Sequence, residues 1–258
     1  RSLSSKKERA ASGLFVAEGE KLVGEMLASE FRVRKIFRCG EEDRSEAGSV
    51  DTEHVSPKEM ERISALKTPT PVLALVELPR YRLSAGTGTD DLALALDGVQ
   101  DPGNLGTVIR TADACGADAV FLSKGSVDLY NPKVLRATMG SLFHVPVFQN
   151  IDLHALSEKM QAKQIPLYAA HLKGNRYPYA LPLQDACAFL IGNEARGLSE
   201  DAAALCDAWV KIPMPGQAES LNEKFTFRTG FVAVGLRGEC RVTRDCAAIS
   251  GRLGSLLT

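Results

Sequence analysis

Up to about residue 78, short segments with helical and strand-like hydrophobic patterns follow one another in mixed order. Apolar residues recur at helical spacing over 20–27, alternate with basic residues over 33–38, and form a further strand-like run over 73–77. Ser56 followed by Pro57 predicts the start of another helix, because Ser is a favourable N-cap and Pro fits the first helical position. The pattern predicts a small mixed α/β module over residues 1–78.

From Leu92 the pattern changes to apolar runs that alternate with helical segments. The run Leu92–Leu96 has no polar residue, which is typical of a strand buried on both faces. Further strands are predicted at 119–122, 145–148, 166–170, 188–191 and 209–212, and helices after Asn104 and over 132–139. This alternation predicts an α/β fold with a mostly parallel sheet and helices on both of its faces.

The predicted domain boundaries follow from these patterns and from the residues between them. Residues 79–90 contain Pro, Ser, Gly and Thr with few apolar residues, and predict a linker. The second domain is then expected at 91–240. The tail 241–258 has no clear amphipathic period, so its order stays open.

Composition excludes several classes of protein. Of the 258 residues, 45% are hydrophobic and 24% are charged, which excludes global disorder. No run reaches the length of a membrane-spanning helix, and the basic N-terminal residues lead into no apolar stretch, so no signal peptide is expected. The six cysteines form no CxxC pair, and predict reduced, buried thiols of a cytoplasmic protein; a zinc site or a catalytic thiol is the alternative. They are Cys39, Cys115, Cys187, Cys206, Cys240 and Cys246.

The formal net charge of −1 hides a local excess of basic residues. Residues 1–40 contain nine Lys and Arg against five Glu, a local net charge of +4. Such a segment fits contacts to nucleic-acid phosphates, and a solvated basic face is the alternative. Arg34, Lys35 and Arg38 are the best candidates for RNA contacts, because the strand pattern brings some of them to one face. Lys124, Lys133 and Arg136 would extend that surface.

Three segments of the second domain contain the residues best suited to catalysis or ligand binding. In the first, a buried strand runs into the Gly- and Pro-containing loop 97–103, then Asn104 and, six residues later, Arg110. Loops at the carboxyl ends of strands are where open α/β sheets bind ligands. The alternative is a tight turn with a surface arginine.

The other two segments also follow predicted strands. One contains Gly192, Asn193 and Glu194, where glycine permits close backbone approach to a ligand; the alternative is a simple junction with Ser199 as the N-cap of the next helix. The other is 210–222, where two prolines exclude a helix across 213–215, so that Ser220 or Asn222 would open the last helix.

Taken together and in this order, the three segments resemble the motifs of the SpoU (TrmH-like) family of RNA 2′-O-ribose methyltransferases, within the SPOUT superfamily. The resemblance covers about residues 92–236, and residues 13–21 look like the family's substrate-binding domain, which has a fold like that of ribosomal protein L30 (L30e-like). It implies a trefoil-knotted SPOUT domain that binds S-adenosyl-L-methionine. The chain departs from the family pattern after Asn222, where 223–228 places charged and aromatic residues in the first turns of the last helix.

The resemblance also implies roles for individual residues. The cofactor site would include Ala170, His171, Gly192, Ile212, Met214 and Leu221. The catalytic set would be Asn104, Arg110, Glu194, Ser220 and Asn222. A guanidinium stays protonated near neutral pH, so we assign Arg110 to orienting an RNA phosphate and stabilising the developing alkoxide, and not to accepting the proton. Asn104 and Asn222 would position the ribose or the loop, Glu194 would hold Arg110 or a backbone amide, and Ser220 would lie near the reacting atoms. No metal is required.

The expected function is methyl transfer from S-adenosylmethionine to a ribose 2′-hydroxyl of RNA by a cytoplasmic homodimer. The extra N-terminal domain favours 23S rRNA as substrate, and tRNA is the alternative. A non-catalytic knotted RNA-binding or ribosome-assembly factor is a second alternative, left open by the departure at Glu223. A nicotinamide enzyme is disfavoured because no GxGxxG follows a strand.

Overall fold

The computed structural model describes residues 2–40, 50–79, 81, 92–181, 186–193 and 195–211. The chain divides into two compact units, one formed by residues 1–80 and 128–144 and the other by residues 81–127 and 145–258. The hydrophobic pattern did not indicate that 128–144 groups with the N-terminal residues. The first unit therefore contains a segment from the middle of the chain, and each unit is described by itself.

The first unit is built on a four-stranded sheet in the order β1-β4-β2-β3, in which β4 is antiparallel to both β1 and β2, and β2 is parallel to β3. The strands are β1 (Leu14–Glu18), β2 (Val33–Arg38), β3 (Thr52–His54) and β4 (Val72–Glu77). The helices of this unit are η1 (Ser2–Ser4), α1 (Lys6–Ser12), α2 (Glu20–Leu27), α3 (Pro57–Ile63), α5 (Pro132–Thr138) and η2 (Ser141–Phe143).

Local sequence explains the ends of these helices. Ser56 and Glu59 form a capping box at the start of α3, in which the Ser56 hydroxyl accepts from the Glu59 N–H and the Glu59 carboxylate accepts from the Ser56 N–H. Gly13 ends α1 with φ of 69°, the left-handed conformation that glycine adopts without strain. The predictions of α2, β2, α3 and β4 are confirmed. The elements α1, β1 and β3 were not predicted.

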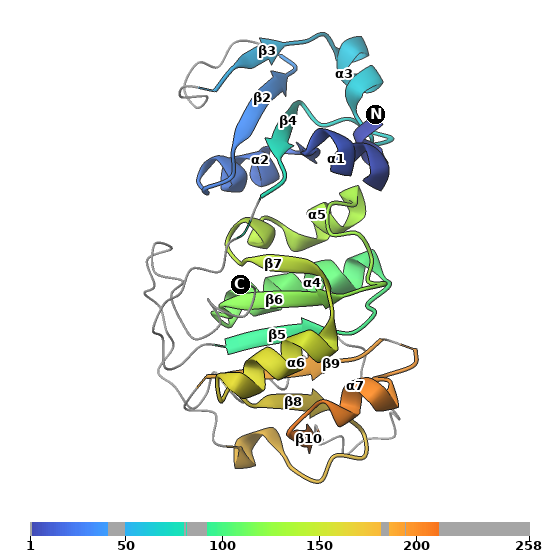
Figure 1. Cartoon of the computed structure of the whole chain (residues 1–258). Helices are drawn as coiled ribbons and strands as arrows, with labels where there is room; N and C mark the ends of the chain where they lie inside the picture. The colour runs from blue at the N-terminus through green and yellow to red at the C-terminus, as the bar shows by residue number, and fades with distance from the viewer. Residues whose placement is uncertain are drawn as a thin grey trace. The chain divides into compact units, whose positions relative to one another are not determined.

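The second unit is built on a six-stranded sheet in the order β10-β8-β9-β5-β6-β7, and every neighbouring pair in it is parallel (Figure 1). Its strands are β5 (Leu92–Leu96), β6 (Ala119–Ser123), β7 (Val147–Ile151), β8 (Leu167–Ala170), β9 (Cys187–Ile191) and β10 (Ala208–Val210). Its helices are α4 (Pro102–Ala114), α6 (Leu153–Ala162), η3 (Pro178–Ala180) and α7 (Glu200–Ala204). The predicted α/β fold with a parallel sheet is confirmed.

The core of this unit follows from strands that are apolar on both faces. Every residue of β5, β6 and β9 is buried. On one face Phe121, Phe148 and Leu190 pack with Leu156 and Met160 of α6, together with Ala202 of α7. Helix α4 lies on the opposite face (Figure 1) and buries Leu105, Val108 and Ile109. Both faces are thus shielded from water, and functional groups are left to the strand ends.

Several elements differ in detail from those predicted by the sequence. Helix α4 begins at Pro102 and not near Asn104, because Asp101 is the N-cap and proline occupies the first helical position. Strand β7 begins at Val147, two residues later than predicted, and α6 was not predicted. Of the four cysteines in the described residues, all free, only Cys187 is buried.

Within the described residues, no helix is long and apolar enough to span a membrane.

Candidate functional site

The order of strands in the second sheet defines where a ligand site is expected. From β5 the chain proceeds to β6 and β7 on one side, whereas β9, β8 and β10 lie on the other. Because all six strands are parallel, their carboxyl ends share one edge of the sheet. In open α/β sheets the ligand crevice lies at the point where the strand order reverses, outside these carboxyl ends. Here that point lies between β5 and β9.

Hydrogen bonds to residues of the neighbouring strands β9 and β6 hold the loop that follows β5. The Asp97 N–H donates to the carbonyl of Ile191 at 2.8 Å, and the Gly98 N–H donates to Ser123 Oγ at 2.9 Å. The same Ser123 hydroxyl donates to Asp97 Oδ1 at 3.0 Å. Gly98 has φ of 67°, a conformation that favours glycine. The loop then enters α4, where Asp101 Oδ1 accepts from the Asn104 N–H at 2.7 Å.

The loop that follows β9 closes on itself. The Asn193 N–H donates to the Gly197 carbonyl at 3.0 Å, and the Gly197 N–H donates back to the Asn193 carbonyl at 2.8 Å. A Cβ on Gly192 would lie 2.2 Å from the Gly197 carbonyl carbon and from the Leu198 nitrogen, so only glycine fits there. Ser199 then caps α7 by accepting from the Ala202 N–H, as in the alternative interpretation of this segment.

Asn193 joins these two loops. Its Nδ2 donates to the Gly98 carbonyl at 2.7 Å, while its Oδ1 accepts from the backbone N–H groups of Ala195 at 3.0 Å and Arg196 at 3.2 Å. The side chain thereby fixes the turn of its own loop and the position of the neighbouring one. The first and second motif segments of the sequence therefore meet at the point where the strand order reverses.

The loop after β8 closes over the end of β10. The His171 N–H donates to the Val210 carbonyl at 3.0 Å, and the Lys211 N–H donates to the Arg176 carbonyl at 2.8 Å. The His171 and Trp209 rings lie 4.5 Å apart between centroids. A Cβ on Gly174 would lie 2.7 Å from the Lys211 nitrogen, so the two backbones touch. This contact fixes where the third motif segment leaves the sheet.

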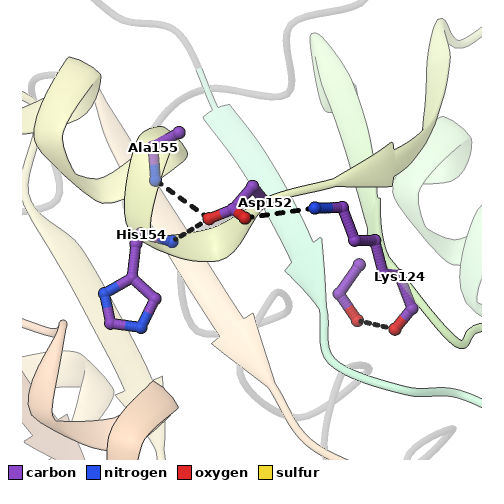
Figure 2. Close-up of polar contacts among 5 residues, drawn as sticks. Lys124, Asp152, His154 and Ala155 are labelled. Carbon is purple, nitrogen blue, oxygen red and sulfur yellow. Dashed lines mark hydrogen bonds and ion pairs between the residues drawn. The ribbon is translucent and has the colours of Figure 1, made fainter.

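At the other side of the same edge, an ion pair joins the ends of β6 and β7 (Figure 2). Lys124 Nζ lies 3.2 Å from Asp152 Oδ2, and Asp152 Oδ1 accepts from the N–H groups of His154 at 3.1 Å and Ala155 at 3.3 Å. The Ala155 hydrogen bond and then Lys124 hold the pKa of the Asp152 carboxyl below its usual value. Lys124, predicted as a possible RNA contact, is thus already paired with a carboxylate.

The described catalytic candidates both lie on α4, on different faces. Asn104 is 5% exposed in the first turn, whereas Arg110 is exposed, six residues and about 9 Å further along the helix axis. Within the described residues the Arg110 guanidinium has no hydrogen-bond or ion-pair partner. Glu194, Ser220 and Asn222 lie outside the described residues.

Three of the predicted cofactor residues lie close together at the edge of the sheet. Ala170 ends β8, His171 follows it and Gly192 follows β9, and these two strands are neighbours in parallel register. The small residues Ala170 and Gly192 and the backbone groups at these positions, with no acidic residue among them, fit a nucleoside recognised mainly through backbone hydrogen bonds. The described residues therefore fit S-adenosylmethionine. Ile212, Met214 and Leu221 lie outside the described residues.

The predicted RNA contacts lie on β2 of the first unit. Arg34 Nε lies 2.5 Å from Glu77 Oε1, and Lys35 Nζ lies 2.7 Å from Glu53 Oε2 and 3.3 Å from Asp51 Oδ2. Arg38 is half-buried and has no ion pair within the described residues. Exposed pairs of this kind contribute little stability, so a phosphate can compete for either cation.

Comparison with known proteins identifies the family. The model of the SpoU rRNA Methylase family matches residues 91–227, and the MRM3-like substrate binding domain matches residues 1–74. The chain belongs to the SpoU rRNA methylase family. A relative from Bacillus subtilis, the 23S rRNA (guanosine(2553)-2′-O)-methyltransferase RlmP, is 36% identical over 85% of this chain and 88% of its own length.

Solved structures of related methyltransferases are similar to this chain over most of its length. A putative RNA methyltransferase of the TrmH family from Porphyromonas gingivalis is 33% identical and has a TM-score of 0.82 over 92% of this chain and 96% of its own. The SpoU methyltransferase AviRb from Streptomyces viridochromogenes, in complex with AdoMet, is 28% identical and has a TM-score of 0.80 over 91% of this chain and 94% of its own. The predicted family is thereby confirmed.

Two residues of this SpoU-family chain with a clear place in the site, Asn193 and Ser123, were given no role from the sequence. The sequence shows Asn193 directly after the glycine that ends a buried strand, and asparagine in that position favours a turn closed by its own side chain. Ser123 is the one polar residue at the end of an otherwise apolar strand. Such single polar residues at the ends of buried strands were the available signal.

Proposed function

We propose that this chain transfers a methyl group from S-adenosylmethionine to a ribose 2′-hydroxyl of 23S rRNA. The observation that carries the proposal is the Asn193–Gly98 hydrogen bond of 2.7 Å, which joins the first two motif segments where the strand order of a SpoU-family sheet reverses. The 23S rRNA substrate of the relative RlmP supports the choice of RNA.

When bound, S-adenosylmethionine supplies an electrophilic methyl group on a sulfonium centre. We propose that Ala170, His171 and Gly192 bind its nucleoside part, and that Ile212, Met214 and Leu221 complete that site. The residues of the chain must then hold a ribose hydroxyl in line with that methyl group, because orientation alone can account for several kcal/mol of barrier reduction.

The exposed guanidinium of Arg110 supports a role for it at the RNA backbone. It would orient a phosphate and stabilise the alkoxide that develops as the 2′-hydroxyl loses its proton to phosphate or water. Asn104 in the first turn of α4 would position the ribose or the loop before it. Glu194, Ser220 and Asn222 are proposed to complete the catalytic set, with Glu194 holding Arg110 or a backbone amide.

The N-terminal unit is proposed to bind the RNA. The match to a substrate-binding domain over residues 1–74 supports this role, and Arg34, Lys35 and Arg38 would contact phosphates. The proposed boundaries are 1–78 for the substrate-binding domain, 79–90 for the linker, 91–240 for the methyltransferase domain and 241–258 for the tail. Within 91–240, the segment 128–144 groups with the first unit. A trefoil knot, a homodimer formed through the knotted domain and a cytoplasmic location are part of the same proposal.

Calorimetry and a transfer assay separate the competing functions. Titration of the full chain with S-adenosylhomocysteine should show binding, and incubation with S-adenosylmethionine and 23S rRNA lacking the modification should transfer label. No cofactor binding would exclude a methyltransferase. Binding without transfer to either 23S rRNA or tRNA would favour a non-catalytic RNA-binding factor, and transfer to tRNA alone would favour the alternative substrate.

A further inference from the structure

On the basis of the proposed methyl transfer, we propose that Asn193 is a positioning residue that aligns the ribose-binding segment with the cofactor-binding loop. Neither loop alone holds both reactants, because Gly192 belongs to the proposed cofactor site whereas Asn104 and Arg110 follow the loop after β5. The reaction therefore depends on the distance between the two loops. The Asn193 side chain fixes that distance through its hydrogen bond to Gly98.

The contact lies at the point where the two backbones part. The bond from the Asp97 N–H to the Ile191 carbonyl, at 2.8 Å, is the last backbone hydrogen bond between the ends of β5 and β9 among the described residues. Beyond it, the 2.7 Å bond from Asn193 Nδ2 to the Gly98 carbonyl continues the connection. Without this bond the loops would be joined only through the strands that precede them.

Gly98 is held by residues that follow or end the two strands on either side of β5. Ser123 at the end of β6 accepts from its N–H at 2.9 Å, and Asn193 beyond β9 donates to its carbonyl. Three residues later Asp101 caps α4. The peptide groups of Gly98 thus fix the start of the helix that carries Asn104 and Arg110, and loss of one of the two restraints shifts that start.

The asparagine amide performs two separable tasks. Its oxygen closes the turn of its own loop by accepting from Ala195 and Arg196, and its nitrogen makes the bond to Gly98. An aspartate keeps the oxygen acceptors but has no N–H to donate, and its second oxygen would face the Gly98 carbonyl. Asn193→Asp therefore breaks the contact between the loops and keeps the turn, whereas Asn193→Ala removes both.

The test compares Asn193→Asp with Asn193→Ala and with Asn150→Asp, which makes the same chemical change at an exposed position of β7. The first readout is hydrogen exchange of the peptide spanning 97–101 in the full chain without RNA. Exchange should rise in Asn193→Asp and stay at the wild-type rate in Asn150→Asp. This readout does not require that the chain be active, so it separates the positioning role from the proposed function. Unchanged exchange in Asn193→Asp would overturn the proposal.

The second readout is single-turnover methyl transfer with 23S rRNA, measured beside the affinity for S-adenosylhomocysteine. A misplacement of about 1 Å lowers rates about 100-fold, so the single-turnover rate constant of Asn193→Asp should fall between about tenfold and 100-fold while cofactor affinity stays within about threefold. Asn193→Ala should lose cofactor affinity as well. A single-turnover rate constant of Asn193→Asp within about twofold of wild type, or a fall matched by equal loss of cofactor affinity, would overturn the positioning role.

Discussion

The guanidinium of Arg9 forms an ion pair with the carboxylate of Asp128, 119 residues later in the chain. Both side chains are shielded, with 4% and 17% exposure, and Arg9 also donates to the Leu3 carbonyl at 2.5 Å. Beside this pair, Tyr130 packs against Phe15 with ring centroids 4.7 Å apart. Segment 128–144 is therefore integral to the first unit, and deletion of residues 1–78 would remove the partners of its buried side chains.

We expect Arg9→Ala to destabilise the chain by about 3 kcal/mol, because removal of one partner leaves Asp128 largely buried without its charge partner. The measurement is urea unfolding followed by circular dichroism. Lys7→Ala, an exposed position on the same helix, is the control and should stay within about 0.5 kcal/mol of wild type. A loss in Arg9→Ala as small as in the control would show that the pair does not hold the segment.

Arg110→Ala should retain cofactor binding and lose methyl transfer. The side chain is exposed on α4 and is not among the residues proposed to bind cofactor, whereas removal of one charged group that stabilises a developing alkoxide costs about 100- to 1000-fold in rate. Calorimetry with S-adenosylhomocysteine and single-turnover transfer measure the two effects. Arg62→Ala on α3 removes an arginine that is outside the proposed catalytic set and is the control. Transfer at the wild-type rate in Arg110→Ala would contradict the assigned role.

The pH dependence of stability should report on Asp152. Its pKa is lowered in the folded chain by the Ala155 N–H and by Lys124, so its contribution is present above the pKa of the unfolded chain and is lost as pH falls through the lower folded value. The melting temperature of Asp152→Asn should lie below wild type near neutral pH, and the two should converge in acid. Glu158→Gln, further along α6, is the control. A difference that grows as pH falls would contradict this sign.

RNA binding through β2 should show in the salt dependence of affinity. Each phosphate contact that is lost lowers the slope of log K against log salt by about 1, so Arg34→Ala combined with Arg38→Ala should lower it by about 2. Lys159→Ala combined with Lys163→Ala, on and just after α6, changes the net charge equally in the second unit. Equal slopes for the two double variants would mean that Arg34 and Arg38 contact no phosphate.

Much of the fold was predictable because burial on two faces leaves a distinct pattern. Runs such as Leu92–Leu96 and Cys187–Ile191 contain no polar residue, and both are fully buried strands. Candidate capping residues marked the starts of helices correctly where the N–H that they bind is only three residues away, as at Ser56 and Ser199. The start of α4 was misplaced because Asp101 and Asn104 are both good capping residues, and the side chain of Asp101 makes the bond.

Other features depend on contacts between distant residues, which no local pattern reports. The grouping of 128–144 with the first unit depends on partners such as Arg9 and Phe15, more than a hundred residues away. The pairing of Arg34 with Glu77 depends on the antiparallel neighbour β4. The role of Asn193 required knowledge that β9 lies beside β5. Sequence indicates which residues have useful chemistry, and topology determines which of them meet.

The most direct test of the proposed function is nucleoside mass spectrometry of 23S rRNA after incubation with the full chain and S-adenosylmethionine labelled in its methyl group. The label should appear in a 2′-O-methylated nucleoside, whose linkage to the next nucleotide resists alkali because the attacking hydroxyl is blocked. It should be absent when Arg110→Ala replaces the wild-type chain. Label on a base, or no label from a chain that binds S-adenosylhomocysteine, would contradict ribose methylation of 23S rRNA.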